Sequence, residues 1–320
     1  MTWYSPRLII TKSQAIVINN MSLNCDLSKQ SKACILNKHQ FTNWEQWLDK
    51  IVDLKGDWLY RGQYSSKSLE SSLESDCKRS GFSLDNADKI ENHMIRHFKR
   101  VYDREDSDIV KDDTLYCLSL MRHYGAPTRL LDFSYSKYLA TYFALEAAYR
   151  CLPNPSNLQP TCTVWCINQQ TLYNKTNSIP GVNELLQSRR SSDKNRRDNT
   201  FWPLYMENKF TFASWENPME LHKRLHLQQG TFLCPGSIKT SLMNNLLIPF
   251  SDTPTKFIYK FTCHFTPKSL QKAFLHFRRM GITRESLFPG LDGLAQSMTY
   301  QLCFYHKLDY WVNRELRFRE

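Results

Sequence analysis

The sequence predicts an α+β fold, because helical patterns dominate its first half and strand patterns dominate its second half. Of its 320 residues, 41% are hydrophobic and 23% are charged, which is typical of a globular protein rather than a disordered one. No run of 18 apolar residues is present, so a membrane span is not expected. Only 10 glycines occur, and neither G-x-G-x-x-G nor G-x-x-x-x-G-K-[ST] is found, which argues against Rossmann and P-loop folds.

The first half contains mostly predicted helices. The clearest one is capped by Thr42 or Asn43, repeats apolar residues at helical spacing from Trp44 to Val52, and ends at Gly56. The other expected elements of this half are a strand over residues 57–61, helices around residues 90–102, 115–122 and 137–149, and a buried strand over residues 128–132.

The second half alternates more strongly. Every second residue from Phe257 to Phe265 is aromatic or cysteine, which predicts a strand with one apolar face over residues 256–265. A helix should then begin at Pro267 and end at Gly281. The remaining expected elements are a strand over residues 162–167, a polar loop over residues 187–199, a short apolar run over residues 232–235 and a last helix over residues 291–305.

These elements predict one domain over residues 41–310. Residues 1–40 show no clear period and are interpreted as an N-terminal arm, which either adds a strand to the core or binds a partner. Residues 311–320 form a basic C-terminal tail. Ten cysteines occur without a C-x-x-C pair, so we expect reduced cysteines in a cytoplasmic protein and no metal site.

The charge balance favours a polyanionic partner. The chain has 42 basic and 31 acidic residues, a formal net charge of +11, which suits a nucleic acid or an acidic protein. The polar loop is the strongest candidate for phosphate contacts, although a solvated loop without a ligand explains its composition equally well. Its basic residues are Arg189, Arg190, Lys194, Arg196 and Arg197.

Four segments carry chemistry that is too specific for a surface and too polar for a core: residues 59–63, 123–134, 224–232 and 287–295. In the first, Arg61 ends a predicted strand and precedes Gly62, an arrangement that suits a bidentate phosphate contact or an ordinary surface arginine. In the second, Arg129 and Asp132 flank a buried strand and can form an ion pair.

Two further groups in these segments have alternative roles. His123 either bonds to backbone in a turn or serves as a base or as a hydrogen-bond partner for a ribose or nucleobase. Gln228 and Gln229 precede a glycine and a strand, where an amide can hold a ribose hydroxyl but cannot act as a base. Arg224 is either a second phosphate contact or a structural partner.

Together, the four segments resemble the FRG domain family, which is named for a motif of the Tyr60-Arg61-Gly62 type. The most specific resemblances are the H-Y-G-x-P-T-R-L-L-D pattern of residues 123–132 and the L-F-P-x-L-D-G-L-A pattern of residues 287–295. The resemblance extends over about residues 41–300. Gly290 departs from it, because an acidic residue is expected there.

The FRG pattern in turn resembles ADP-ribosyltransferases, which implies a split mixed β-sheet core with flanking helices. Their serine motif is followed by an alanine six residues later and a phenylalanine three residues after that, and Ser134, Ala140 and Phe143 have this spacing. Their catalytic glutamate is replaced here by Gln229. A glutamine supplies no negative charge, and losing one charge-assisted contact costs on the order of 10²–10³ in rate.

The resemblance implies an NAD-dependent mono-ADP-ribosyltransferase, with NAD as substrate and no metal. Arg61 would hold the pyrophosphate, Gln229 would position the electrophilic carbon, and His123 would act as a base. Glu285, Asp132 or the substrate itself are alternative sources of the missing acid or base. The other residues implied at the NAD site are Gly62, Arg129, Asp132, Ser134, Tyr142 and Phe143.

The expected acceptor is nucleic acid, and mRNA in particular, because of the net charge and the basic loop. The resemblance further implies a cytoplasmic bacterial toxin of phage defence that a neutralising antitoxin protein holds inactive, with no membrane partner. Three alternatives remain at this point. They are a catalytically degenerate module that senses a nucleotide or nucleic acid, a transferase that modifies protein, and a nuclease or hydrolase built on His123 and Asp132.

Overall fold

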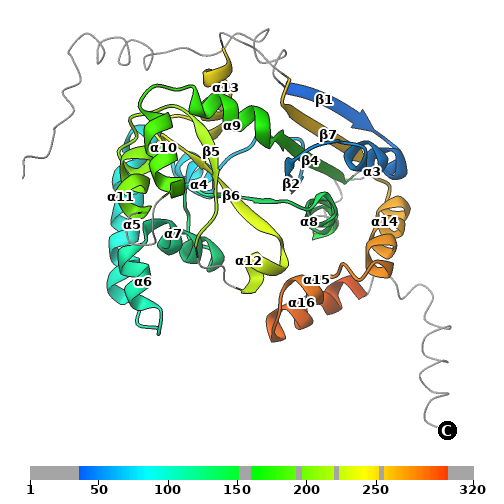
Figure 1. The fold of residues 1–320 in the computed structure, drawn as a ribbon. Coiled ribbons are helices and arrows are strands. Elements are labelled where there is room, and N and C mark those ends of the chain that lie inside the picture. Colours follow the sequence, from blue (N-terminus) through cyan, green and yellow to red (C-terminus); the bar gives the residue numbers. More distant parts are fainter. Residues whose placement is uncertain (1–35, 151–159, 192–196, 220–222, 252–255, 302–320) are drawn as a thin grey trace, which may run out of the picture.

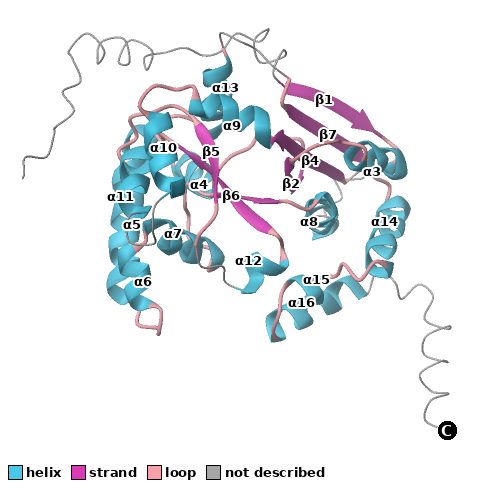
Figure 2. Ribbon diagram, in the orientation of Figure 1, coloured by secondary structure: helices cyan, strands magenta, loops and turns pink. Residues whose placement is uncertain are grey.

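The computed structural model describes residues 36–150, 160–191, 197–219, 223–251 and 256–301 and confirms an α+β fold (Figure 1). A mixed sheet of seven strands runs in the order β1-β7-β4-β2-β3-β6-β5, and helices flank it (Figure 2). The strands are β1 (Leu36–Phe41), β2 (Trp58–Tyr64), β3 (Leu131–Ser134), β4 (Thr161–Asn168), β5 (Ala213–Glu216), β6 (Gly230–Pro235) and β7 (Ile258–His264).

The sheet is continuous on either side of one weak junction. Strand β2 pairs with β4 at seven successive positions, but it meets β3 at a single register position, Tyr60 opposite Ser134. Beyond that point, β3 continues into a regular antiparallel ladder with β6. The two strands that carry the first two sequence motifs therefore diverge from each other, and space opens between them.

Helix α8 (Lys137–Arg150) packs directly against β2 because Gly62 has no side chain. A Cβ atom at Gly62 would lie 1.8 Å from the carbonyl oxygen of Ala140 on α8. The glycine that follows Arg61 thus lets the helix and the strand approach closely, which fixes the position of α8 beside the sheet junction.

The predicted helix after Asn43 is confirmed as α3, with the Asn43 side chain accepting from the backbone N–H of Gln46 at 2.9 Å. The helices of the described chain are α3 (Trp44–Val52), α4 (Ser72–Ser80), η1 (Leu84–Asn86), α5 (Ala87–Val101), α6 (Ser107–Asp112), α7 (Thr114–His123), α8, α9 (Gln169–Asn177), α10 (Val182–Ser191), α11 (Arg197–Phe201), η3 (Trp202–Met206), α12 (Lys223–Leu227), α13 (Leu242–Leu247), η4 (Ile248–Phe250), α14 (Pro267–Arg279), α15 (Arg284–Leu287) and α16 (Leu291–Gln301).

The core lies on both faces of the sheet. One cluster joins α3, α8 and α14 to the sheet, and the indole N–H of its buried Trp47 donates to the carbonyl oxygen of Phe261 on β7 at 3.0 Å. A second cluster lies around α5, α7 and β6, with Leu118 and Phe232 among its buried members. None of the helices in the described ranges combines the length and the apolar composition of a membrane span.

Several sequence expectations are corrected. Residues 187–191 belong to helix α10 and residues 197–199 to α11, so the predicted loop is wrong for both parts, and residues 192–196 lie outside the described chain. Strand β2 continues to Tyr64, so Arg61 lies inside the strand rather than at its end. Strand β1 begins at Leu36 and pairs with β7, so residues 36–40 follow the alternative in which the N-terminal segment adds a strand to the core, and residues 1–35 lie outside the described chain.

Candidate functional site

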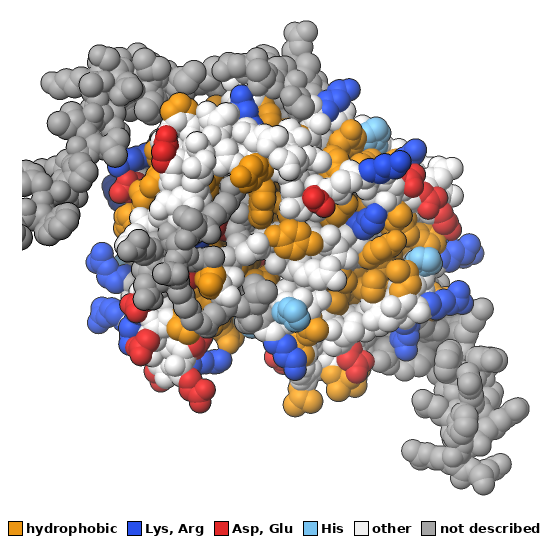
Figure 3. Space-filling model, in the orientation of Figure 1, with side chains coloured by type: hydrophobic (Ala, Val, Ile, Leu, Met, Phe, Trp, Pro, Cys, Tyr) orange, Lys and Arg blue, Asp and Glu red, His pale blue; other side chains and the backbone are white. Residues whose placement is uncertain are grey.

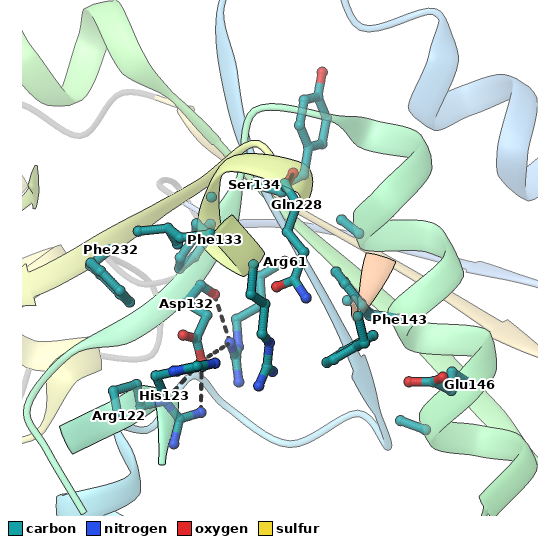
Figure 4. A pocket seen from close by; sticks show the side chains of 18 of the residues that line it. Arg61, Arg122, His123, Asp132, Phe133, Ser134, Phe143, Glu146, Gln228 and Phe232 are labelled. Carbon is teal, nitrogen blue, oxygen red and sulfur yellow. Dashed lines mark hydrogen bonds and ion pairs between the residues drawn. The ribbon is translucent and has the colours of Figure 1, made fainter. Parts of the chain in front are cut away.

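A cavity of about 460 Å³ lies at the junction between β2 and β3 (Figure 4). Its walls are formed by these two strands, by α8, by the end of α7, by α12 with β6, and by α15. All four segments singled out in the sequence contribute residues to it. The volume falls in the range of about 300–1,000 Å³ that is usual for small-molecule sites.

The cavity carries a positive surplus, because five arginines and only two carboxylates line it in the described chain. On the face of the molecule shown in Figure 3, basic side chains are instead spread around the periphery with acidic ones among them. A cavity of this charge favours an anionic ligand. The charged lining residues are Arg61, Arg122, Arg150, Arg224, Arg284, Asp132 and Glu146.

Arg61 and Arg122 converge on Asp132. The Nη1 of Arg61 donates to the backbone carbonyl of Asp132 at 2.6 Å and lies 3.8 Å from its Oδ2. The same Oδ2 accepts from Nε and Nη2 of Arg122 at 2.9 and 2.7 Å, so this guanidinium holds the carboxylate with two donors. Figure 4 shows the three side chains joined on one side of the cavity.

These contacts fix the charge state of the group. Burial alone would raise the pKa of Asp132, but the charges of Arg122 and Arg61 outweigh it and lower that pKa. Burial lowers the pKa of Arg61 to about 10, although Asp132 opposes this shift, and Arg61 therefore stays protonated at neutral pH. The Nε of Arg61 is buried and has no hydrogen-bond partner in the described structure, so one donor remains for a ligand.

Ser134 connects β3 to the segment before β6. Its hydroxyl donates to the backbone carbonyl of Gln228 at 2.8 Å, and the side-chain amide of Gln228 donates to the carbonyl of Leu287 at 3.2 Å. Gln228 lines the cavity, whereas Gln229 is exposed, has a left-handed backbone with φ of 44°, and does not line it. The prediction that Gln229 faces the site is therefore corrected to Gln228.

His123 lies at the C-terminal end of α7 and lines the cavity as expected. Its ring lies 4.8 Å from that of Tyr124. Burial lowers the pKa of His123 below its ordinary value, and the positive charges of Arg224 and Arg104 lower it further. The imidazole is therefore neutral at neutral pH, which is the form that can accept a proton.

The two aromatic residues of helix α8 that were predicted for the site line different cavities. Phe143 lines the cavity, but Tyr142 is buried and lines a separate cavity of about 220 Å³ instead. Three residues after Phe143, Glu146 also faces the main cavity, and Figure 4 shows both on the side opposite Arg122 and His123. Tyr142 is thus corrected from a ligand contact to a core residue.

Arg129 is also not at the site. It is completely buried, and its Nε donates to Glu91 on α5 at 2.7 Å, while Nη1 donates to the carbonyl of Tyr205. The expected ion pair between Arg129 and Asp132 is replaced by pairs from Arg129 to Glu91 and from Asp132 to Arg122. A fully buried and paired arginine holds the fold together and does not reach a ligand.

The basic segment predicted to contact phosphates looks different in the structure. Arg189 is 6% exposed and pairs with Glu216 on β5 at 2.8 Å, so its guanidinium is not available on the surface. Arg190 and Arg197 lie in helices α10 and α11. Lys194 and Arg196 fall outside the described residues.

The cavity also contains two charged groups that the sequence analysis did not identify, Glu146 and Arg284. Glu146 is buried and accepts from Nη1 of Arg284 at 2.7 Å. The guanidinium carbon of Arg284 lies 3.9 Å from the ring centre of Phe288, and that of Arg224 lies 4.4 Å from the same ring. The helical spacing of Glu146 from Phe143 was the one available signal, since both fall on one face of a predicted helix.

The FRG domain model matches residues 56–151, which supports the FRG family for this chain. The matched range contains Arg61, Arg122, Asp132 and Glu146 but not the segments at residues 224–232 and 287–295. No curated protein and no solved structure matches the chain. No cluster of three or more potential metal ligands occurs in the described part of the chain.

Proposed function

We propose, on the premise of an FRG domain over residues 56–151, that this protein is an NAD-dependent mono-ADP-ribosyltransferase that modifies nucleic acid, and RNA in particular. One observation carries the proposal. The junction between β2 and β3 places Arg61, Ser134 and Gln228 around one positively charged cavity, with an unused Arg61 donor. NAD brings a pyrophosphate that this charge would attract.

The reaction exchanges one bond at the nicotinamide ribose. The bond between C1′ and the nicotinamide nitrogen breaks, and a bond forms between C1′ and an oxygen or nitrogen of the acceptor. Neutral nicotinamide leaves with the bonding electron pair, and the proton of the acceptor goes to a base. Positive charge builds up on the ribose in the transition state, so a nearby carboxylate would stabilise it.

Glu146 is the strongest candidate for that carboxylate. Asp132 is held by two arginines, which stabilise its charge in place, and Glu285 lines the smaller cavity instead. Glu146 is buried in the wall of the main cavity and is bound by the single arginine Arg284. His123, neutral because of its lowered pKa, is the candidate base for the acceptor proton.

A second candidate function is a sensor that binds a nucleotide or nucleic acid without turnover. One observation favours it, because both carboxylates that line the cavity are already paired with arginines. Neither glutamine at positions 228 and 229 can replace the missing negative charge. Binding of NAD without release of nicotinamide would distinguish this sensor from a transferase.

The biological setting proposed for the transferase is a cytoplasmic toxin of phage defence, kept inactive by a neutralising protein. This part rests on the family resemblance and on the net charge of +11, which suits an RNA substrate. Modification of protein by the same chemistry is the alternative that the acceptor assay must separate.

The decisive experiment uses NAD labelled in its adenylate phosphate with separate pools of RNA, DNA and cell protein. We expect label in RNA, and we expect Arg61→Ala to remove it. Arg79→Ala is the matched control, because Arg79 is exposed on α4 and its ion pair in the described structure is with Asp76 on the same helix. Label confined to the cell-protein pool would overturn RNA as the proposed substrate. If the purified, folded chain neither labels any pool nor releases nicotinamide, the sensor is favoured.

A further inference from the structure

One part of the cavity wall holds two guanidinium groups against a single aromatic ring. Arg224 on α12 and Arg284 on α15 lie 4.4 and 3.9 Å from the ring centre of Phe288. Both arginines also line the main cavity, together with Phe288 itself. Two like charges that share one ring repel each other, so this arrangement needs a compensating negative group.

Protein groups supply only part of that compensation. Arg284 pairs with Glu146 at 2.7 Å, but Arg224 forms no ion pair with any carboxylate in the described chain. Arg150, which also lines the cavity, donates to the neutral partners Tyr300 and Gln296. Five arginines therefore line the cavity with two carboxylates in the described chain, and the carboxylate that acts most strongly on Arg224, Asp132, is already bound by Arg122 and Arg61.

The electrostatics of Arg224 reflect this surplus. Burial lowers the pKa of Arg224, Asp132 opposes the shift, and the charges of Arg284 and Arg122 lower the pKa further. A bound anion would reverse the effect of these neighbouring cations.

Arg284 adds an observation that is independent of charge. Its side chain is 10% exposed, and its Nε is buried without a hydrogen-bond partner in the described structure. A buried donor on a charged group is costly to leave unpaired, because it has lost its water and gained no replacement. An oxygen-rich anion in this part of the cavity could accept from it.

We propose that Arg224 and Arg284, held against Phe288, form a second phosphate-binding subsite in the cavity, in addition to Arg61. The chemistry fits a phosphate group because planar guanidinium groups offer paired donors that match its oxygens. The ring of Phe288 lies against both guanidinium groups and holds them beside each other. This assignment rests on the proposed nucleotide function, and it names two residues outside the segment that matches the family model.

The phosphate could come from either of two substrates in the proposed reaction. It could be the pyrophosphate of the dinucleotide, with Arg61 then contacting a different group, or a phosphodiester of the RNA acceptor. The assay therefore measures both ligands separately. Calorimetry follows the binding of ADP-ribose, and fluorescence anisotropy follows a short single-stranded RNA without terminal phosphates.

Arg224→Gln is the main variant. Because Arg224 forms no ion pair in the described chain, removing its charge leaves no carboxylate without its partner. Lys223→Gln is the matched control, since Lys223 lies on the same helix, is exposed and does not line the cavity. We expect Arg224→Gln to lower the affinity for at least one of the two ligands about tenfold or more. The control should change neither affinity by more than about twofold.

Arg284→Lys is the second variant, because it keeps a positive charge beside Glu146 but loses the planar fork. It should weaken the same ligand as Arg224→Gln, with an unchanged near-UV circular dichroism spectrum showing a folded core. Weaker ADP-ribose binding would identify the dinucleotide as the source of the phosphate, and weaker RNA binding would identify the acceptor.

The subsite and the transferase can fail separately, because the binding assays involve no turnover. Wild-type affinity of both folded variants for both ligands would overturn the subsite, and so would wild-type protein that binds neither ligand at millimolar concentration. Binding that depends on Arg224, in a protein that releases no nicotinamide from NAD, would keep the subsite and reject the transferase.

Discussion

Gly62→Ala tests whether the close packing of α8 on β2 shapes the cavity. The added Cβ would lie 1.8 Å from the carbonyl oxygen of Ala140 and 2.7 Å from the backbone nitrogen of Ala144. Non-bonded carbon contacts are ordinarily about 3.5 Å, so α8 must withdraw from the strand by more than about 1 Å. Overpacking typically costs about 1–3 kcal/mol, and because both close atoms belong to the backbone we expect the upper end.

The same shift should impair the site more than the fold. Helix α8 carries Phe143 and Glu146 in the cavity wall, and a misplacement of about 1 Å can cost a reaction about 100-fold. Urea denaturation measures the free energy of unfolding. NAD binding and nicotinamide release measure the function of the site. Gly56→Ala is the control, because Gly56 has φ of 87° with nothing within 4 Å, so only local strain of about 1–2 kcal/mol is added. Wild-type stability and activity in Gly62→Ala would refute the close packing described here.

Two further predictions concern charged groups. Glu91→Gln leaves the buried Arg129 without its counter-ion and should lower the free energy of unfolding by about 3–5 kcal/mol. Replacing both residues by apolar ones should recover most of this loss. A loss below about 1 kcal/mol in chemical denaturation would contradict the prediction. Arg104→Gln removes a cation that lowers the pKa of His123, so that pKa should rise in an NMR titration. Because the proposed base is the neutral imidazole of His123, the acid limb of the pH–rate profile should move to higher pH, and a shift to lower pH would argue against the assignment.

The elements that the sequence predicts well are those with a clear local signal. Helix α8 was expected over residues 137–149 and runs from Lys137 to Arg150, and the alternating segment at residues 256–265 contains β7. The capped start of α3 is likewise local, since Asn43 and the backbone it caps lie three residues apart. Each of these patterns records a burial preference that neighbouring residues share, so no knowledge of distant partners is needed.

Errors of one residue have a different origin. The sequence favoured Gln229 over Gln228, and grouped Tyr142 with Phe143, although in each pair only one residue faces the cavity. Which of two adjacent side chains faces inward depends on the local backbone, and Gln229 has a left-handed φ of 44° that a sequence pattern does not indicate. A motif can therefore locate a site to within a turn of chain and still assign the wrong side chain.

Buried charges were the least predictable feature. Arg189 looked like part of a solvated basic loop, but its partner Glu216 is 27 residues away and becomes a neighbour only through the fold. The same holds for Glu146 and Arg284, which are 138 residues apart. A buried charge is tolerated only with a partner. Sequence alone identifies candidate charges, whereas the fold decides which ones are paired and which are available to a ligand.

The position of the cavity follows from how the sheet is joined. Arg61 lies on β2 and Glu146 on α8. These two elements form one unit, because Gly62 lets the helix pack closely on the strand. Gln228 and Arg224 lie instead on the segment leading into β6, on the other side of the weak β2–β3 junction.

Across that junction, β2 and β3 share one register position. The Ser134 hydroxyl, at this position, donates to the backbone carbonyl of Gln228. Arg61 also binds the backbone carbonyl of Asp132 across this junction, so both arms of the site meet where the two parts of the sheet join. An anionic ligand that contacts both Arg61 and Arg224 would hold these two parts together, and its binding energy would oppose any change in the angle between them.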